Sequence, residues 1–365
     1  MSEWQTFCLK DLGKIVGGAT PSTNNPKNYG NKIAWITPKD LSTLQGRYIK
    51  KGSRSISRLG FKSCSCVLLP KHAILFSSRA PIGYVAIAKK RLCTNQGFKS
   101  IIPNKKIYFE FLYYLLKYHK DNISNIGGGT TFKEVSGATL GLFKVKIPPT
   151  YYEQQKIART LSILDQKIEN NHKINELLHT LAYKIYEYYF KYKPKNAKLE
   201  QIIIENPKSS IMVKNAQKTQ DKYPFFTSGD NILSYPKAII DGRNCFLNTG
   251  GNAGIKFYIG KASYSTDTWC ICANEFSDYL YLLLSSIKTH INQSFFQGTS
   301  LKHLQKNLLK KYPIYMPSAH EIKKFNQIIM PLLTLISINT RTSKKLEQIR
   351  DFLLPLLLKQ QVKPQ

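Results

Sequence analysis

The sequence predicts a mixed α/β fold of the α+β kind, in which two tandem globular modules are each followed by a long helix. Three observations lead to this prediction. Seam residues repeat at alternating steps of four and three after Tyr151, the heptad pattern of a helix that packs along another helix. A second seam, from Phe325 to Leu357, repeats the first at a constant offset in residue number. The segments before the two seams also match in order, which indicates a tandem duplication.

The two seams have the same register throughout. The first contains Ile157, Leu161, Leu164, Ile168, Asn171, Asn175, Leu178, Ala182, Ile185 and Tyr189. The second contains Phe325, Ile329, Leu332, Ile336, Asn339, Ser343, Leu346, Arg350, Leu353 and Leu357. One such helix alone would most simply be a bundle or core helix, but two matched copies indicate that the helices pack on each other.

Polar and helix-breaking residues interrupt these seams. Asn171 and Asn339 occupy the same seam site, where a polar side chain costs stability but can fix the register. Pro331 leaves open whether the second helix starts late or kinks. Arg350 in the second seam favours a looser closure at that end of the chain.

Length and charge limit the classes of protein. A chain of 365 residues exceeds the size of a single core, so two domains are expected. The 54 Lys and Arg against 22 Asp and Glu give a net charge of +32, which indicates a polyanionic partner. The charge is dispersed rather than gathered on one amphipathic helix, so nucleic acid is favoured over lipid. No signal peptide or membrane span is evident, so we expect the cytoplasm.

The repeat predicts the boundaries of the segments. We expect a first module at residues 1–150, a first long helix at 151–193, a second module at 194–317, a second long helix at 318–360 and a tail at 361–365. The first module is predicted to contain strands at Ile33–Thr37, Cys66–Leu69, Ala73–Ser77, Tyr84–Ala88 and Phe143–Thr150, a helix at Phe109–Lys120 and a Gly-rich turn at Gly127–Thr131.

The second module repeats the first with a shorter middle part. Leu199–Ile204 echoes Leu9–Ile15, and Thr227 matches Thr37 at the same offset. From Thr249 onward matched residues lie closer together in the sequence, as in the match of Trp269 with Phe98. The second module has therefore lost residues between Thr227 and Thr249.

The sequence lacks the motifs of the enzymes that a basic DNA-handling protein could be. It has no phosphate-binding loop and no tetrad of the amino-methyltransferase type. Glu321-Ile322-Lys323 has nuclease-like spacing, but a charge pair at a helix start is the simpler interpretation. The pairs Cys64/Cys66 and Cys270/Cys272 are too closely spaced for a typical zinc site, and we expect buried apolar cysteine. We therefore predict no catalytic site and no metal site.

Both modules contain basic and polar residues in or beside predicted turns, where such side chains can contact phosphates and base edges. The candidate DNA-binding residues are Thr37, Lys39, Arg47, Lys51, Arg54, Arg58 and Arg79 in the first module, and Thr227, Ser228, Asn231, Arg243, Asn248, Asn252 and Lys256 in the second. For any single Lys, a solvated surface charge is an equally simple interpretation. Trp35, Phe98 and Trp269 are expected in strand cores rather than as base-stacking platforms.

Five segments together resemble the specificity (S) subunits of type I restriction-modification systems. They are EWQTFCLKDLGKIVGGATPS (Glu3–Ser22), IAWITPKDL (Ile33–Leu41), SSRAPIGYVAI (Ser77–Ile87), TNQGF (Thr94–Phe98) and KVKIPPTYYEQQKIARTLSILDQKI (Lys144–Ile168). The resemblance implies two target-recognition domains held apart by two long antiparallel coiled-coil helices with pseudo-twofold symmetry. Each domain would read one half of a bipartite double-stranded DNA target.

The resemblance also implies partners. Methyltransferase (M) subunits, two of them, would dock on the helices, and restriction (R) subunits would complete the nuclease. S-adenosylmethionine, ATP and Mg would be bound by those subunits, and this chain would bind no cofactor. The alternative is a basic tandem-module nucleic-acid-binding adaptor outside restriction-modification, which the absence of a methyltransferase partner would favour. The target sequence and its spacer length cannot be read from these residues.

Overall fold

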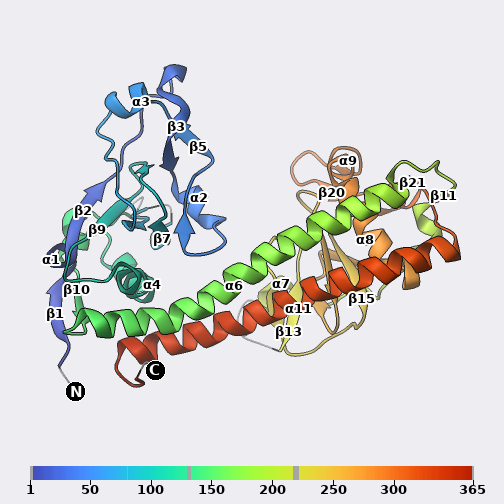
Figure 1. The fold of residues 1–365 in the computed structure, drawn as a ribbon. Coiled ribbons are helices and arrows are strands. Elements are labelled where there is room, and N and C mark those ends of the chain that lie inside the picture. Colours follow the sequence, from blue (N-terminus) through green and yellow to red (C-terminus); the bar gives the residue numbers. More distant parts are fainter. Residues whose placement is uncertain (1–2, 80, 130–132, 217–221, 364–365) are drawn as a thin grey trace. The chain divides into compact units, whose positions relative to one another are not determined.

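The computed structural model describes residues 3–79, 81–129, 133–216 and 222–363. The chain divides into two compact units, one made of residues 1–171 with 342–365 and one made of residues 172–341. Each unit contains a globular module and part of both long helices, α6 (Tyr151–Tyr186) and α11 (Ala319–Leu358) (Figure 1). The division of the chain at residues 150, 193, 317 and 360 stays a prediction.

The first module contains a five-stranded sheet in the order β2-β9-β6-β7-β4 and a three-stranded sheet in the order β5-β3-β8. A short ladder of β1 and β10 closes the module beside the long helix. The strands are β1 Gln5–Cys8, β2 Gly13–Gly17, β3 Tyr29–Ile36, β4 Tyr48–Ile49, β5 Arg54–Ile56, β6 Ile74–Phe76, β7 Val85–Ala88, β8 Cys93–Thr94, β9 Lys99–Pro103 and β10 Lys144–Ile147. The helices are α1 Leu9–Leu12, α2 Pro38–Ser42, α3 Arg58–Lys62, α4 Phe109–Asn125 and α5 Gly137–Leu142.

The second module contains a four-stranded sheet in the order β12-β18-β15-β16 and a three-stranded sheet in the order β14-β13-β17. Its strands are β11 Ala197–Lys198, β12 Ile204–Glu205, β13 Tyr223–Phe226, β14 Leu233–Tyr235, β15 Arg243–Asn248, β16 Ile255–Ile259, β17 Ser263–Tyr264, β18 Thr268–Cys272, β19 Phe296–Gln297, β20 His303–Leu304 and β21 Pro313–Ile314. Its helices are α7 Val213–Ala216, α8 Ser277–Ser286, α9 Lys288–Ser294 and α10 Lys306–Lys310.

The strand orders confirm the predicted duplication. The order β2-β9-β6-β7 returns as β12-β18-β15-β16, and β5-β3-β8 returns as β14-β13-β17. The parallel pairing of β3 with β8 has its counterpart in the parallel pairing of β13 with β17. The ladder of β1 and β10 likewise corresponds to that of β11 and β21.

The apolar run Cys66–Leu69 of the first module does not form the predicted strand. Only Leu69 pairs, through an isolated bridge to Leu92, so that prediction is wrong. Cys66 and Leu68 pack in a small core instead of joining a ladder, and Val67 is exposed. Within the predicted Gly-rich turn, Thr130 and Thr131 lie outside the described residues.

Both long helices start with the same capping arrangement. Glu153 N donates to Thr150 Oγ1 (3.2 Å), and Thr150 Oγ1 donates to the Glu153 carboxylate (3.0 Å). Ser318 and Glu321 form the matching pair of the repeat, and the backbone N–H of Ser318 donates to Glu321 Oε2 (2.9 Å). The hydrogen bonds from Ser318, Lys193 and Tyr315 lower the pKa of Glu321 to about 2. The predicted helix-start role of Glu321 is therefore confirmed.

The two long helices pack antiparallel along the predicted seam. In the first unit Asn171 Nδ2 donates to Ser343 Oγ (3.2 Å), while in the second unit Asn339 Nδ2 donates to Asn175 Oδ1 (3.0 Å). The seam side chains of both helices are buried or half-buried. The α-helix runs through Pro331 without interruption, and α6 continues into a π-helical turn at Glu187–Lys191.

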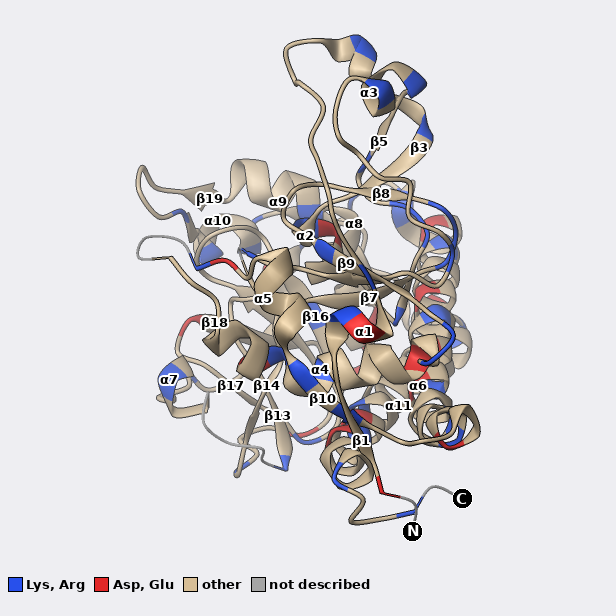
Figure 2. Cartoon of the chain, turned by 90° about the vertical axis from the view of Figure 1, so that its left-hand side faces the viewer, with Lys and Arg blue, Asp and Glu red and all other residues tan. Residues whose placement is uncertain are grey.

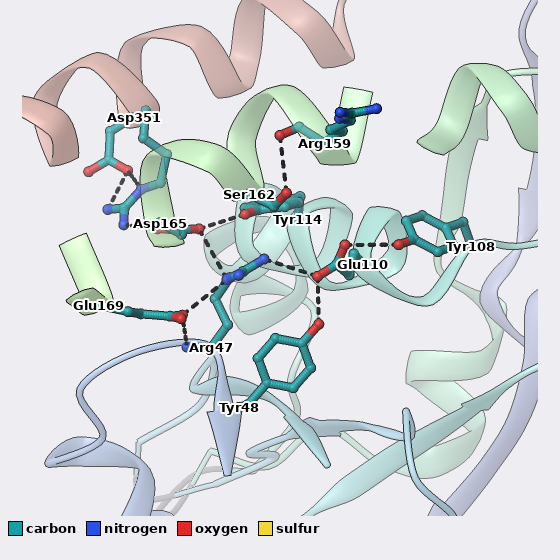
Figure 3. A network of polar contacts seen from close by, with 11 residues as sticks. Arg47, Tyr48, Tyr108, Glu110, Tyr114, Arg159, Ser162, Asp165, Glu169 and Asp351 are labelled. Carbon is teal, nitrogen blue, oxygen red and sulfur yellow. Dashed lines mark hydrogen bonds and ion pairs between the residues drawn. The ribbon is translucent and has the colours of Figure 1, made fainter. Parts of the chain in front are cut away.

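A buried cluster of charges joins the first module to α6 (Figure 3). The Arg47 guanidinium lies 3.0 Å from Glu110 Oε1 at the start of α4 and 3.1 Å from Glu169 Oε1 of α6. Arg47 is only 3% exposed. Asp165 of α6 extends the cluster, because it accepts from Tyr114 Oη (2.6 Å) and from Arg350 Nη1 of α11 (2.7 Å). Arg350, a residue of the second seam, therefore has a buried carboxylate partner, and the looser closure at this end of the chain stays a prediction.

The second unit has a comparable cluster formed by a different arginine. Arg243, the first residue of β15, donates through Nε to Asp278 Oδ2 (2.6 Å) and through Nη1 to Thr334 Oγ1 of α11 (3.2 Å). Asp278 occupies the position of the repeat that matches Glu110, at the equivalent start of its helix. In each unit an arginine of the module therefore links the repeated helix carboxylate to a long helix.

We predict that Arg47→Ala destabilises the first unit by about 3–5 kcal/mol, because removal of one partner leaves buried carboxylates without a countercharge. Urea unfolding of the full chain measures the effect. Arg79→Ala is the matched control: Arg79 pairs with Glu134 at 3.6 Å but its side chain is 38% exposed, so its loss should cost less than about 1 kcal/mol. Equal costs for the two substitutions would contradict a structural role for the buried cluster.

We also predict that Asn171 and Ser343 are energetically coupled across the helix seam. Each single substitution to Ala leaves the buried partner without its hydrogen bond, at a cost of about 1–3 kcal/mol. The double variant should cost less than the sum by about 0.5–1.5 kcal/mol, measured as a double-mutant cycle in urea. The exposed neighbour Asn170 is the control and should show no coupling to Ser343. Strict additivity of the Asn171 and Ser343 effects would argue against the antiparallel register.

Candidate nucleic-acid interface

Four of the candidate DNA-binding residues of the first module are exposed cations. Lys39 lies on α2, Lys51 follows β4, Arg54 starts β5 and Arg58 starts α3. All four side chains are exposed, and none takes part in an ion pair within the described part of the chain. Figure 2 shows the basic residues on α3 with no acidic residue on that helix. Their charges are therefore available to an anionic partner.

Local contacts fix the backbone that carries Arg54 and Arg58. Ser57 caps α3 by accepting a hydrogen bond from Gly60 N (3.0 Å). A Cβ at Gly60 would lie 2.0 Å from the carbonyl oxygen of Asn28, so only glycine allows α3 to approach that segment. The pairing of Arg54 with Trp35 aligns β5 on β3, and the Arg54 guanidinium lies over the Tyr29 ring at 5.7 Å. A concavity of about 500 Å³ beside Arg54 is lined by Thr23, Pro26, Tyr29, Gly30, Asn31, Ser53 and Ser55.

Thr37, another candidate, has a structural partner. Its hydroxyl donates to Asp40 Oδ2 (2.7 Å), and its backbone N–H donates to the same oxygen (2.8 Å), so the pair forms the capping box of α2. Burial acts to raise the pKa of Asp40, but hydrogen bonds from Ser53 and Thr37 outweigh it and lower that pKa. The Thr37 side chain therefore stabilises α2 rather than projecting from the surface.

Arg47 and Arg243 are corrections to the candidate set. Both were expected at the surface because they lie beside turns, but both bind carboxylates inside their own units. An arginine with these partners cannot neutralise a phosphate without leaving the carboxylates unpaired. Arg79 is intermediate, since it is partly exposed and lies 3.6 Å from Glu134.

The structure brings four candidates of the second module into one polar cluster. Lys256 Nζ donates to Thr227 O (2.9 Å) and to Asn248 Oδ1 (3.1 Å), while Asn248 Nδ2 donates to Asn252 O (3.1 Å). Burial lowers the pKa of Lys256, and the side chains of Thr227 and Asn248 are each 6% exposed. A Cβ at Gly254 would lie 2.3 Å from Asn248 Nδ2, so glycine makes room for this cluster.

Asn252 joins that cluster only through its backbone carbonyl, so its side chain is not part of the cluster. Asn231 and Asn252 are exposed, and Ser228 is half-buried with its hydroxyl bonded to the carbonyl of Asp267. These side chains are neutral. The amides of Asn231 and Asn252 offer hydrogen-bond donors and acceptors to base edges but no countercharge to phosphates.

Sequence reasoning missed several exposed cations of the first module. Lys62 of α3 and the run Lys89-Lys90-Arg91 after β7 are exposed and have no ion pair among the described residues. The sequence contains a signal for these free cations, because no Asp or Glu that could pair with them occurs between Asp40 and Glu110. The buried aromatic residues were predicted correctly: Trp35, Phe98 and Trp269 are at most 4% exposed.

The described residues contain no group of three or more His, Cys, Asp or Glu side chains arranged to hold a metal ion. Cys66, Cys93, Cys245 and Cys270 are buried, whereas Cys64 and Cys272 are partly exposed. Within the described range, no helix has both the length and the apolar character needed to cross a membrane.

Known proteins show the same organisation of sequence and fold. The chain is 33% identical over 403 aligned positions to the type I restriction enzyme MjaIX specificity subunit of Methanocaldococcus jannaschii, with 98% of this chain and 93% of that protein covered. It is 30% identical to the HindI specificity subunit of Haemophilus influenzae over 46% of this chain and 37% of that one. The crystal structure of the type I restriction-modification S subunit from M. genitalium superposes with a TM-score of 0.64 at 17% identity, covering 97% of this chain and 96% of that one.

The superposition on the S subunit from M. genitalium shows that the two chains share a fold. The family of type I restriction modification DNA specificity domains matches this chain twice, over residues 1–180 and 195–348. Each match contains one globular module and most of the long helix that follows it. The chain therefore belongs to the type I restriction-modification DNA specificity family.

Proposed function

We propose that this chain is the non-catalytic specificity subunit of a type I restriction-modification complex and reads a bipartite double-stranded DNA target. The observation that carries the proposal is the repeated module with one strand order, each copy leading into a long antiparallel helix, in a member of the DNA specificity family. Two homologous but non-identical modules can each read a different short sequence. The exposed, unpaired cations of the first module support contact with the DNA backbone.

The side chains proposed to contact DNA are those that the structure leaves available. In the first module these are Lys39, Lys51, Arg54 and Arg58, and in the second they are Asn231 and Asn252. The Ser228 hydroxyl already has internal partners, because it donates to Asp267 O and accepts from Thr249 N. Arg47, Arg243, Thr37, Thr227, Asn248 and Lys256 serve the fold instead. Their substitution would impair DNA recognition only indirectly.

The long helices offer surfaces for partner subunits. Ile163, Ile174, Leu177 and Leu181 of α6 and Leu335, Ile338, Ile349 and Phe352 of α11 are exposed apolar side chains. Exposed apolar surface on a soluble protein commonly marks a binding site. We propose that methyltransferase subunits dock there, two per chain because the sequence is duplicated, and that restriction subunits join the assembly. S-adenosylmethionine, ATP and Mg would be bound by those subunits, in the cytoplasm.

The competing interpretation is a nucleic-acid adaptor outside restriction-modification. Membership of the specificity family over most of the chain disfavours it. Co-purification of a DNA methyltransferase with this chain would distinguish the two, since an adaptor of another kind has no need of that subunit.

We predict that deletion of the gene abolishes N6-methyladenine at one bipartite motif, two short half-sites around a non-specific gap. Single-molecule sequencing of the genome with and without the gene measures this. Reintroduction of the wild-type gene should restore methylation at the same motif. If the pattern of methylated motifs is identical in both strains although the partner methyltransferase is expressed, the proposed role is wrong.

A further inference from the structure

We propose that the two modules contribute unequally to DNA binding. The first module supplies most of the phosphate contacts, and the second reads its half-site chiefly through neutral side chains. This inference rests on the proposed DNA-reading function and adds that the two homologous modules make different kinds of contact with DNA. The inference is based on a difference between the two modules in net charge and in exposed charged residues. Two modules of the same fold need not differ in this way.

The difference is greatest in the middle part of each module. Residues Leu41–Phe109 contain fourteen Lys and Arg and no Asp or Glu. The equivalent residues of the second module, Asn231–Ser277, contain four Lys and Arg and three Asp and Glu. The net charges of these segments are thus +14 and +1. Strong attraction of a polyanion is therefore expected only from the first segment.

Most of the cations in the first segment are free to bind an external anion. Arg47, Arg79 and Lys99 pair with carboxylates of the module. The other eleven are exposed and form no ion pair in the described part of the chain: Lys50, Lys51, Arg54, Arg58, Lys62, Lys71, Lys89, Lys90, Arg91, Lys105 and Lys106. Cations without an internal carboxylate partner are those that DNA phosphates can engage at no cost to the fold.

The second segment presents a different surface. Arg243 and Lys256 are used inside the module, so only Lys237 and Lys261 remain exposed. Three exposed carboxylates, those of Asp241, Asp267 and Glu275, offset them. The exposed Asn231 and Asn252 can still read bases, because such contacts need hydrogen bonds rather than charge.

Part of the additional charge of the first module lies on and beside connections that are longer than those of the second module. The connection from β3 to β5 carries α2 and β4, and the connection from β5 to β6 carries α3. The equivalent connections, from β13 to β14 and from β14 to β15, contain no helix. We call residues 48–68 the basic lobe; it carries Lys50, Lys51, Arg54, Arg58 and Lys62.

The basic lobe is packed rather than loose. Ile56, Phe61, Cys66 and Leu68 of the lobe join Trp35 and neighbouring residues in a small core of their own. A cation held on a packed element loses little conformational freedom when it meets a phosphate. The lobe is therefore suited to anchor the protein on DNA of any sequence.

The proposal predicts a measurable salt dependence. Each phosphate contact contributes a slope of about 0.9 to the fall of log K with log salt concentration. We would measure the affinity of the full chain for a fluorescent duplex of arbitrary sequence, long enough to span both modules, by anisotropy at several NaCl concentrations. A duplex without the target suffices, because the phosphate term does not depend on sequence.

The decisive comparison uses two triple variants with equal loss of charge. The first is Arg54→Gln, Arg58→Gln and Lys62→Gln in the basic lobe, and the second is Lys237→Gln, Lys261→Gln and Lys302→Gln in the second module. All six side chains are exposed, so the thermal midpoints should not change. We expect the first variant to lower the slope by about 2–3 and the second to lower it by less than about 0.5.

The outcomes separate this inference from the function on which it rests. Equal reductions by both variants, or a larger reduction by the second-module variant, would overturn the unequal division but leave DNA recognition intact. Absence of salt-dependent binding by the wild-type chain would refute both. If the triple lobe variant fails to fold, Arg58→Gln alone decides the question, since it should lower the slope by about 1.

Discussion

The structure depends on an arginine that links each module to a long helix, Arg47 being buried and Arg243 half-buried. A guanidinium removed from water needs carboxylate or hydroxyl partners in the right geometry, and Arg47 and Arg243 both have them. A module that shifted along its helix would separate Arg47 from Glu169 of α6, at a cost of several kcal/mol, or Arg243 from Thr334 of α11. The apolar seam permits packing in general, whereas these charge clusters select one position of each module on its helix.

The two units place an arginine beside the helix carboxylate from different positions of the module. The carboxylates Glu110 and Asp278 and the caps of α6 and α11 stand at equivalent positions of the repeat. The arginines do not, because Arg47 precedes the edge strand β4 and Arg243 begins the inner strand β15. Both units keep an arginine beside the helix carboxylate, but the arginine comes from a different part of the module in each.

The sequence predicted what is periodic or repeated and failed where the outcome depends on tertiary partners. The seams, the duplication and the strands at Ile33, Ala73 and Tyr84 follow from local patterns. Whether a turn arginine is buried depends on a carboxylate far away in the sequence, as with Arg47 and Glu169, and no local pattern records that. The apolar run at Cys66 resembles a strand but pairs only at Leu69, and the Asn248 side chain is used internally because it accepts a hydrogen bond from Lys256.

The capping boxes have a consequence for how this chain can vary in length. Each box sets the angular phase of a helix relative to the strand that ends a few residues earlier, Ile147 for α6 and Ile314 for α11. One residue added between strand and cap would turn every seam side chain by about 100° about the helix axis. Insertions and deletions are therefore tolerated in the loops of the modules, where the second copy is in fact shorter, and are excluded at the junctions between module and helix.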